Sequence, residues 1–393
     1  MRKFFWLVLF LVMQSSPSVA QKYRRLHRKA MVADSHNDFL SVSIDKNVAF
    51  DQDLTGITQS DLNRMKKGGI DLQIFSIWCD QTYTKGKAYA HANREIDSLY
   101  SIVSRNSSSM MMVRTAAEMN AFLRSGKLGA MIGVEGGHMI EDDLSKLDSL
   151  FSRGARYLTL TWNNSVPWAS SAMDETIRKD SIKSAGLNEF GRKVVARMNE
   201  LGMMVDVSHV GEKTFYDVMQ TTTKPVMASH SCAWALNPSF RNLKDEQILA
   251  IGKNNGVIQL NFYSGFLDSN FSKNNQAFFA RHKAEKDSIM LTNPVEYLAE
   301  SVLLRKYPAE IREMRPSISL LIDHIDHIVK LIGVDHVGLG SDFDGISSSP
   351  KELNDVADMP LVTAELLKRG YSKKSIKKIL GENFIRVFRA NVN

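Results

Sequence analysis

Five side chains of the types that bind divalent metal ions follow short apolar runs that are widely separated along the chain. They are His36, Asp38, Glu135, His209 and His230. Neutral imidazoles and carboxylates suit zinc and similar divalent ions. Taken alone, each histidine would more often be a hydrogen-bonded or surface residue, Glu135 could be a buried ion-pair partner, and Asp38 could cap the next segment. Their shared position after apolar runs favours one metal site.

The number of candidate ligands indicates two ions. A single four-coordinate catalytic ion must keep one position open, and five ligands exceed that need. In the arrangement that uses them best, His36 and Asp38 hold one ion. His209 and His230 hold the other, and Glu135 bridges the two. A water shared by two such ions is deprotonated near neutral pH, and the resulting hydroxide can attack a polarised carbonyl.

The elements that must position these residues follow a repeating pattern. Short apolar or β-branched runs alternate with segments of helical apolar spacing, which is typical of βα units around a parallel sheet. The predicted strands are residues 31–34, 71–78, 130–135, 156–161, 203–207, 225–228, 257–261 and 336–341. The predicted helices include residues 88–103, 144–152, 188–201, 213–219, 318–332, 372–380 and 382–390.

Eight parallel strands, each followed by a helix, favour a closed TIM-type (β/α)₈ barrel of the α/β class over an open doubly wound sheet. The carboxyl ends of all strands meet at one mouth of such a barrel. Residues far apart in the sequence then become neighbours. The barrel therefore predicts that the five candidate ligands gather at its mouth.

Residues 264–316 interrupt the alternation of predicted strands and helices. The segment is rich in Asn, Lys and Ser, and only local helical pieces such as residues 294–307 are predicted in it. Connections this long are uncommon and tend to be functional or mobile. The segment leaves the carboxyl end of the seventh predicted strand, so we interpret it as a lid or a dimer contact. A surface elaboration without a role is the open alternative.

The first twenty residues have the pattern of a signal peptide. A basic start precedes an apolar run from Phe4 to Met13, and small residues precede the expected cleavage after Ala20. The run is shorter than the roughly 20 residues that span a bilayer, and no apolar tail ends the chain. We therefore expect a soluble protein that is secreted or periplasmic, with no membrane span. Residues 21–393 are predicted to form one domain.

The composition and charge are those of an ordinary globular protein and give no sign of nucleic-acid binding. With 44% apolar and 24% charged residues, the chain is ordinary globular material. The net charge of +7 falls to +5 once Arg2 and Lys3 are removed, and the basic residues form no stripe. Nucleic-acid binding is therefore not indicated.

The two cysteines of the chain, Cys79 and Cys232, are predicted to be free thiols. They follow the second and sixth predicted strands, which lie on opposite sides of an eight-stranded barrel. A disulfide requires Cα atoms within roughly 7 Å.

Eight motifs occur in a fixed order along the chain. They are His-Asn-Asp at 36–38, Gly-Val-Glu-Gly-Gly-His at 133–138, Arg-Tyr-Leu-Thr-Leu-Thr at 156–161, Asp-Val-Ser-His at 206–209, Ser-His-Ser at 229–231, Arg-Asn at 241–242, Gly-Ser-Asp-Phe-Asp-Gly at 340–345 and Gly-Glu-Asn-Phe at 381–384. In this order they closely resemble the membrane (renal) dipeptidase family of zinc peptidases. The resemblance covers nearly all of residues 21–393 except 264–316. It implies an amidohydrolase-type (β/α)₈ barrel, often a homodimer, with two zinc ions at the mouth.

The resemblance also implies roles for single residues. It assigns the five candidate ligands to zinc, with Glu135 bridging. It makes Asp342 the residue that transfers a proton and Arg241 the residue that binds the substrate carboxylate. Family members hydrolyse dipeptides, accept a D-residue at the C-terminal position, and in some cases open β-lactams.

Two rival functions stay open. A hydrolase of another amide or ester, such as a lactone, a β-lactam or an N-acyl amino acid, would use the same fold. A non-catalytic metal- or peptide-binding protein would be signalled by the loss of ligands or of Asp342. All six residues are present, which disfavours the second rival.

One position departs from the mammalian pattern of the family. Where mammalian members carry a His thought to contact the substrate carbonyl, this chain has Trp162, followed by Asn163 and Asn164. The departure leaves the ligands untouched and concerns oxyanion stabilisation and substrate range. Trp162 could offer its indole N–H, and either asparagine an amide donor. We favour the alternative in which Trp162 is a packed wall of a substrate pocket.

Three further residues, His138, Asp206 and Asp344, are predicted to orient the ligands from behind. Ordinary hydrogen bonding within loops is an equally open interpretation for each of them.

Overall fold

The computed structural model describes residues 19–83, 86–292 and 296–392. The predicted signal peptide therefore lies almost wholly outside the described residues and stays a prediction. No helix in the described ranges combines the length and the apolar character that a membrane crossing requires.

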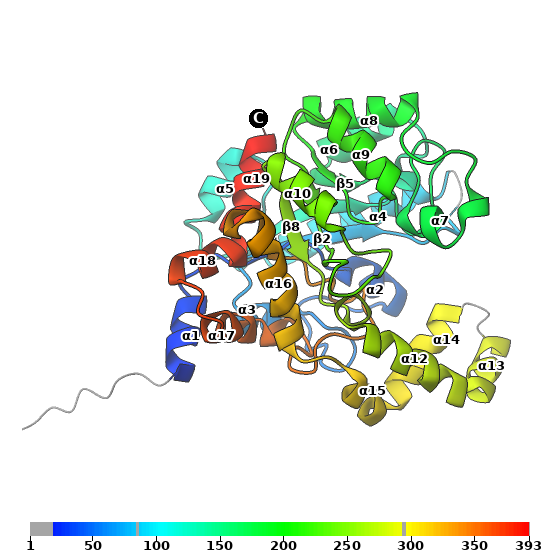
Figure 1. Ribbon diagram of the computed structural model, residues 1–393. Helices are drawn as coiled ribbons and strands as arrows, with labels where there is room; N and C mark the ends of the chain where they lie inside the picture. The colour runs from blue at the N-terminus through cyan, green and yellow to red at the C-terminus, as the bar shows by residue number, and fades with distance from the viewer. Residues whose placement is uncertain (1–18, 84–85, 293–295, 393) are drawn as a thin grey trace, which may run out of the picture.

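A curved parallel sheet forms the centre of the molecule (Figure 1). Within the described part of the chain, eight parallel strands follow one another around it, and the predicted TIM-type barrel is confirmed. Their order is β1 (Ala33–Asp34), β2 (Leu72–Trp78), β4 (Leu128–Glu135), β5 (Ala155–Thr159), β6 (Met204–Asp206), β7 (Met227–Ala228), β8 (Val257–Leu260) and β9 (Val337–Leu339). A short strand that was not predicted, β3 (Met110–Met112), pairs with β4 outside this path.

Backbone hydrogen bonds join the last strand to the first, just beyond the regular ladders. The amide of Ser35 donates to the carbonyl of Leu339 over 3.1 Å, and the amide of Asp342 donates to the carbonyl of His36 over 3.1 Å. The Asp34 carboxylate adds a side-chain link, because it accepts from the amide and the hydroxyl of Ser341. These bonds bring the segment after β9 against the segment after β1.

Helices surround the sheet. Outside the insertion they are α1 (Val19–His27), α2 (Phe39–Lys46), α3 (Leu62–Gly68), α4 (Ala88–Arg105), α5 (Ala116–Phe122), α6 (Leu144–Ser152), α7 (Ala172–Thr176), α8 (Glu189–Leu201), α9 (Glu212–Thr221), α10 (Asp245–Lys253), α16 (Ile318–Ile332), α17 (Pro360–Lys368), α18 (Lys373–Lys377) and α19 (Asn383–Asn391). The bounds of α6 and α16 agree with the predicted ranges. In α16 the buried Leu321, Ile325 and Ile328 repeat at helical spacing, and the hydroxyl of Ser317 caps the amide of Ser319.

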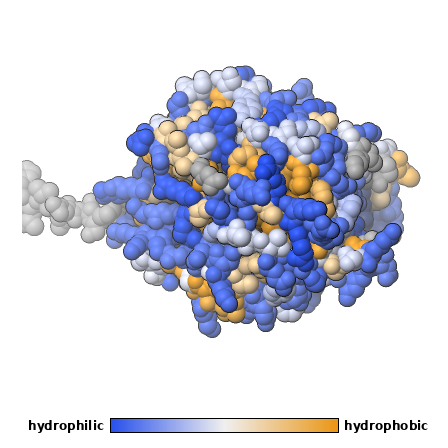
Figure 2. Space-filling model, turned by 90° about the horizontal axis from the view of Figure 1, so that it is seen from above, coloured by the Kyte–Doolittle hydropathy of each residue, from blue (hydrophilic) through white to orange (hydrophobic). Residues whose placement is uncertain are grey.

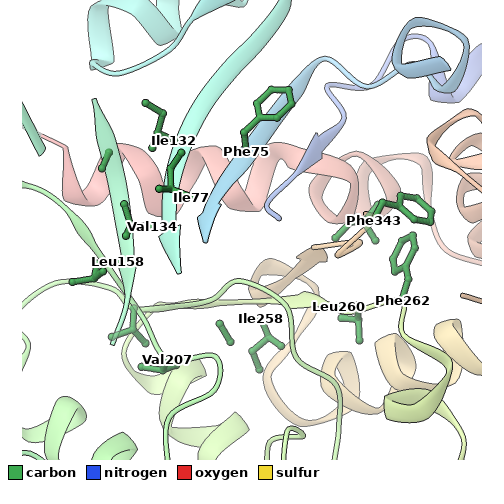
Figure 3. Packing of buried hydrophobic residues seen from close by; sticks show 14 of the residues in the cluster. Phe75, Ile77, Ile132, Val134, Leu158, Val207, Ile258, Leu260, Phe262 and Phe343 are labelled. Atoms are coloured by element: carbon green, nitrogen blue, oxygen red, sulfur yellow. The ribbon is translucent and has the colours of Figure 1, made fainter. Parts of the chain in front are cut away.

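Side chains alternate between the two faces of each strand. Phe75 and Ile77 of β2 pack with Ile132 and Val134 of β4 in the large apolar cluster (Figure 3). The alternate residues of β2, such as Ile74, belong to a second cluster that draws one or two residues from most strands. Because successive side chains point to opposite faces, the strand residues of this second cluster lie in the barrel interior. Residues of α5 and α19, such as Phe122 and Phe384, complete the cluster. On the face that Figure 2 shows, hydrophilic residues separate the apolar patches.

The insertion contains more helix than the sequence predicted. Its helices are α11 (Ser264–Leu267), α12 (Ser269–Arg281), α13 (Lys283–Thr292), α14 (Glu296–Lys306) and α15 (Pro308–Met314). Helices α12 to α15 extend to one side of the barrel (Figure 1). They share a small apolar cluster of Phe278, Leu303, Leu304 and Ile311. The single-domain assignment of residues 21–393 stays a prediction.

The prediction of two free thiols is confirmed, because Cys79 and Cys232 are both buried and unbridged.

A buried histidine of α16 links the loop after β7 to the start of the insertion. The Nδ1 atom of His324 accepts from the amide of Ala233 over 3.0 Å, and its Nε2 atom lies 3.1 Å from the carbonyl oxygen of Leu267. An amide can only donate, so Nδ1 carries no proton and Nε2–H donates to Leu267. Burial lowers the pKa of His324 to about 4.

This histidine predicts a loss of stability in acid. Since its pKa in the folded protein lies below the usual value of 6.5, protonation favours the unfolded chain as the pH falls through 6.5 toward 4. Replacing His324 by Gln removes this contribution. The difference in unfolding free energy between parent and H324Q should therefore shrink by about 2 kcal/mol between pH 7 and pH 5. Denaturant unfolding at both pH values measures it, and a constant difference would contradict the assignment.

Candidate metal centre

The five candidate ligands all lie at the carboxyl ends of barrel strands. His36 and Asp38 follow β1, Glu135 is the last residue of β4, His209 follows β6, and His230 follows β7. All five are buried. The closed barrel accounts for their meeting, because it brings these strand ends to one mouth.

Glu135 lies at the centre of the group, with one carboxylate oxygen directed to each side. Its Oε2 atom is 3.4 Å from His36 Nε2. Its Oε1 atom is 2.8 Å from His209 Nε2 and 3.4 Å from His230 Nε2. On the Oε2 side, His36 Nε2 is also 3.6 Å from Asp38 Oδ2. His36 and Asp38 thus lie on the Oε2 side of Glu135 and His209 and His230 on its Oε1 side, while the rings of His36 and His230 also lie close together, with centres 3.9 Å apart.

These residues fit divalent cations. Two of their polar atoms, His36 Nε2 and Asp38 Oδ1, are buried without a hydrogen-bond partner. An unpaired buried polar atom costs free energy, which a bound cation would offset. The Nε2 atoms of His209 and His230 face each other at 2.9 Å. Imidazole nitrogens and carboxylate oxygens at this spacing form the donor set that zinc and related ions accept.

The charges of the site also favour a cation. Burial raises the pKa of Asp38 well above its usual range, and the neighbouring carboxylates of Glu135 and Asp342 add to the effect. Burial likewise opposes the charge of Glu135, but the positive charge of His36 and hydrogen bonds from His209 and His230 hold its pKa well below the usual range.

The histidines respond to the same cluster. Although burial favours the neutral ring of His36, the carboxylates of Glu135 and Asp38 raise its pKa to about 10. Burial, together with the charge of Arg241, lowers the pKa of His209 to about 4. The ring of His230 is held neutral in the same way, since burial and the charge of His36 lower its pKa. Burial and the neighbouring carboxylates thus oppose the ionised form of Asp38, while His36 is held as an imidazolium beside Glu135.

The outer nitrogen of each histidine has its own partner. His36 Nδ1 lies 2.8 Å from the hydroxyl of Tyr157, and His209 Nδ1 lies 3.2 Å from Asn163 Oδ1. His230 Nδ1 lies 2.7 Å from the hydroxyl of Ser229. With Nδ1 held in this way, Nε2 of each ring is free to face the centre.

The predicted supporting residues have different surroundings. Asp206 accepts from the Ser229 hydroxyl over 2.6 Å, and the same hydroxyl lies 2.7 Å from His230 Nδ1. Asp206 therefore supports His230 through Ser229, as predicted. His138 instead lies 2.9 Å from the carbonyl oxygen of Cys79, and Asp344 accepts from Ser60 and from the amide of Gln59. For these two, the structure agrees with hydrogen bonding within loops.

Several contacts were not predicted. Tyr157 belongs to one of the recognised motifs, but its inward direction depends on the strand register. A Cβ atom at Gly133 would lie 1.9 Å from the Tyr157 ring, so this glycine leaves the space that the ring occupies. The sequence suggested Asn163 as an amide donor to substrate, whereas the structure places its side-chain Oδ1 atom beside His209 Nδ1.

Asp342 lies on the Asp38 side of the cluster. Its Oδ2 atom accepts a hydrogen bond of 2.8 Å from Asn261 Nδ2. Carboxylate oxygens of Asp38 and Asp342 lie within 4.8 Å of each other and of a His36 nitrogen. The backbone φ angles of Asp342 (61°) and His209 (66°) are in the left-handed region. Residues other than glycine adopt this region at some cost, and here two side chains of the cluster extend from such a backbone.

Arg241 is a buried cation close to the cluster. Its Nη2 atom donates to the carbonyl oxygen of His230 over 3.3 Å, and its guanidinium carbon lies 5.4 Å from the ring centre of Phe266. No carboxylate of the described residues forms an ion pair with it, and burial lowers its pKa to about 10. Arg241 and His209 both line one hollow, together with Trp234.

Trp162 is half-buried and packs edge-to-face against Trp78, with ring centres 5.1 Å apart. Trp78 is the last residue of β2 and the register partner of Glu135 on β4. The two indoles therefore stand together beside the strand end that carries Glu135.

Comparison with known proteins places this geometry in a family. The sequence model of the membrane dipeptidases, peptidase family M19, matches residues 20–393. An uncharacterized dipeptidase of Schizosaccharomyces pombe is 30% identical over 391 residues, which cover 94% of this chain and 82% of that protein.

Solved structures agree. A metallopeptidase of Rhodobacter sphaeroides, liganded with a phosphinate mimic of the dipeptide L-Ala-D-Ala, superposes with a TM-score of 0.74 at 26% identity, covering 92% of this chain and 99% of that one. The probable dipeptidase PvdM of Pseudomonas aeruginosa superposes with a TM-score of 0.76 at 25% identity, covering 95% and 98%. The chain thus belongs to the membrane dipeptidase family, peptidase family M19, and is a metallo-dipeptidase, a hydrolase that acts on small peptides.

Proposed function

We propose that the protein hydrolyses the peptide bond of dipeptides, including those with a C-terminal D-residue, with two zinc ions bound around Glu135. The observation that carries the proposal is the position of Glu135 between buried candidate ligands on both of its oxygens, beside a buried arginine that forms no ion pair with any described residue. The D-residue is supported by the R. sphaeroides relative, whose ligand mimics L-Ala-D-Ala.

The residues divide between the two ions as their distances suggest. His36 and Asp38 would hold one ion, His209 and His230 the other, and Glu135 would give one oxygen to each. Bound divalent ions supply the acidity that makes water a nucleophile near neutral pH, and they polarise a carbonyl. Tyr157, Asn163 and Ser229 keep the three imidazoles in the required orientation.

Asp342 serves as the proton carrier of the reaction. As a carboxylate beside the ligand cluster, it accepts the proton of the attacking water and returns it to the departing amine. The hydrogen bond from Asn261 engages its Oδ2 atom. Proton transfer would then use Oδ1.

Arg241 binds the terminal carboxylate of the substrate. A buried guanidinium without an ion-pair partner is costly, and a bound carboxylate would supply the missing charge. The planar fork of an arginine matches the two oxygens of a carboxylate. Since Arg241 donates to the backbone of His230, its distance from the cluster is fixed. This distance would select dipeptides over longer peptides.

Removing the metal should abolish activity. Chelation should stop dipeptide hydrolysis, and zinc should restore it, with two ions per chain by elemental analysis of the active protein. Glu135→Gln, which keeps the size of the side chain but not its charge, should lose at least one ion. A fully active preparation without bound metal would refute the proposal.

Substitution of the arginine should weaken carboxylate binding. The loss of a charged hydrogen bond is typically worth ~1.5–3 kcal/mol, so Arg241→Ala should lower kcat/KM for a dipeptide by roughly one to two powers of ten. The C-terminal amide of the same dipeptide is the internal control, because it lacks the charge that Arg241 binds. If the parent enzyme cleaves the dipeptide and its amide equally well, Arg241 does not have this role.

Trp162→Phe separates a pocket wall from a catalytic donor. If Trp162 only packs against Trp78, the variant should keep most of its turnover and change which dipeptide side chains are accepted. Loss of an oxyanion donor typically lowers kcat by ~10²–10³. The measurement is kcat on the best dipeptide, with metal content determined in both proteins. A fall of about a hundredfold with both metals retained would instead make the indole N–H a catalytic group.

A further inference from the structure

The insertion begins with a short helix that contacts the loop carrying Arg241. This loop, residues 232–243, connects β7 to α10 and is closed at its base. The amide of Leu243 donates to the carbonyl of Cys232 over 2.8 Å, and the amide of Trp234 donates to the carbonyl of Leu243 over 2.8 Å. Helix α11 packs against the loop at the point where the insertion leaves the barrel.

Two buried asparagines of the loop bind the backbone of α11. Asn237 Nδ2 donates to the carbonyl of Gly265 over 2.9 Å. Asn242 Nδ2 lies 2.8 Å from the carbonyl oxygen of Phe266 and 2.9 Å from that of Asn237. Asn242 is the neighbour of Arg241 in the chain, so these bonds fix the backbone on which the arginine is mounted.

Buried His324 of α16 adds two hydrogen bonds to the same contact. It binds Ala233 in the loop and Leu267 at the end of α11. The loop and α11 are therefore held together by side chains from two segments, the loop itself and α16. A movement of α11 relative to the barrel would displace the loop as well.

The side chain of Arg241 itself has few partners among the described residues. Its guanidinium donates to the carbonyl of His230 and lies over the ring of Phe266, at 5.4 Å from the ring centre. A guanidinium stacks on an aromatic face with its plane held, while its N–H groups point outward along the edge. This is the orientation that a paired contact with a carboxylate needs. Phe266 in turn packs edge-to-face against Tyr263, at 4.8 Å.

We propose that Phe266 is a positioning residue for Arg241, so that the insertion determines the requirement for a free C-terminal carboxylate on the substrate. The proposal rests on the proposed function, in which Arg241 binds that carboxylate. It assigns a role to the start of the insertion that is neither a lid nor a subunit contact. Without the Phe266 ring, Arg241 keeps its charge, but the plane of its guanidinium group is no longer fixed.

Kinetics of Phe266 variants test the proposal. The dipeptide and its C-terminal amide are the two substrates, and the ratio of their kcat/KM values is the readout. Phe266→Ala should raise KM for the dipeptide about tenfold and leave kcat within about twofold, since the contact serves binding. The ratio of dipeptide to amide should fall by a similar factor. Phe266→Tyr, which keeps the aromatic face, should behave as the parent does.

The insertion offers a matched control. Phe279 on α12 is half-buried, as Phe266 is, and a cation also lies over its ring. Lys286 Nζ is 5.3 Å from the ring centre of Phe279. Phe279→Ala removes a similar contact away from the loop of Arg241 and should leave the ratio unchanged. Phe266→Leu fills the space without an aromatic face and keeps the test valid if Phe266→Ala unfolds. It should lower the ratio as Phe266→Ala does.

The outcomes distinguish the positioning role of Phe266 from carboxylate binding by Arg241, on which it rests. A parental ratio in Phe266→Leu, with Arg241→Ala lowering the ratio, would overturn the role of Phe266 and leave that of Arg241 intact. An unchanged ratio in Arg241→Ala would instead overturn carboxylate binding by Arg241, and the role of Phe266 with it. A fall in the ratio with Phe279→Ala as large as that with Phe266→Ala would show a general effect of the insertion and refute the specific contact.

Discussion

The site depends on a carboxylate that is buried among imidazoles at the end of a central strand. Burial opposes the charge of Glu135, and His36, His209 and His230, which approach its two oxygens, favour that charge. These residues come from four parts of the chain, and only a closed barrel brings them together. The hydrogen bonds between the segments after β1 and β9 therefore matter for chemistry as well as for stability, since they place His36 and Asp342 side by side.

Much of this arrangement could be predicted from the sequence, because it follows from periodicity and position. The strands of the barrel path and the ends of α6 and α16 follow from the spacing of apolar residues, and the candidate ligands follow from their place after strands. The contacts of Tyr157 and Asn261 could not be predicted, because they depend on which distant residue the register brings opposite. Strand β3 was missed because three methionines give no alternation. In the insertion, α14 falls within the predicted residues 294–307, but the other helices were not predicted individually, because the apolar residues of α12 to α15 pack mainly on one another.

The insertion shows how a segment outside the barrel pattern can take part in the site. Its composition suggested a lid, a dimer contact or a part without function, and composition alone could not decide between them. The structure adds a link that composition could not reveal: α11 binds the loop that carries Arg241 through Asn237 and Asn242. Substrate selection and the anchoring of the insertion would then share one set of contacts.

Anomalous diffraction from crystals of the zinc-loaded protein would locate the metal ions relative to Glu135. We expect two zinc peaks at the barrel mouth, separated by about 3.5–4 Å as in other two-metal sites. One peak should lie beside His36 and Asp38, the other beside His209 and His230, and an oxygen of Glu135 should reach each. A single peak, or two peaks that Glu135 does not join, would rule out a two-zinc site bridged by Glu135.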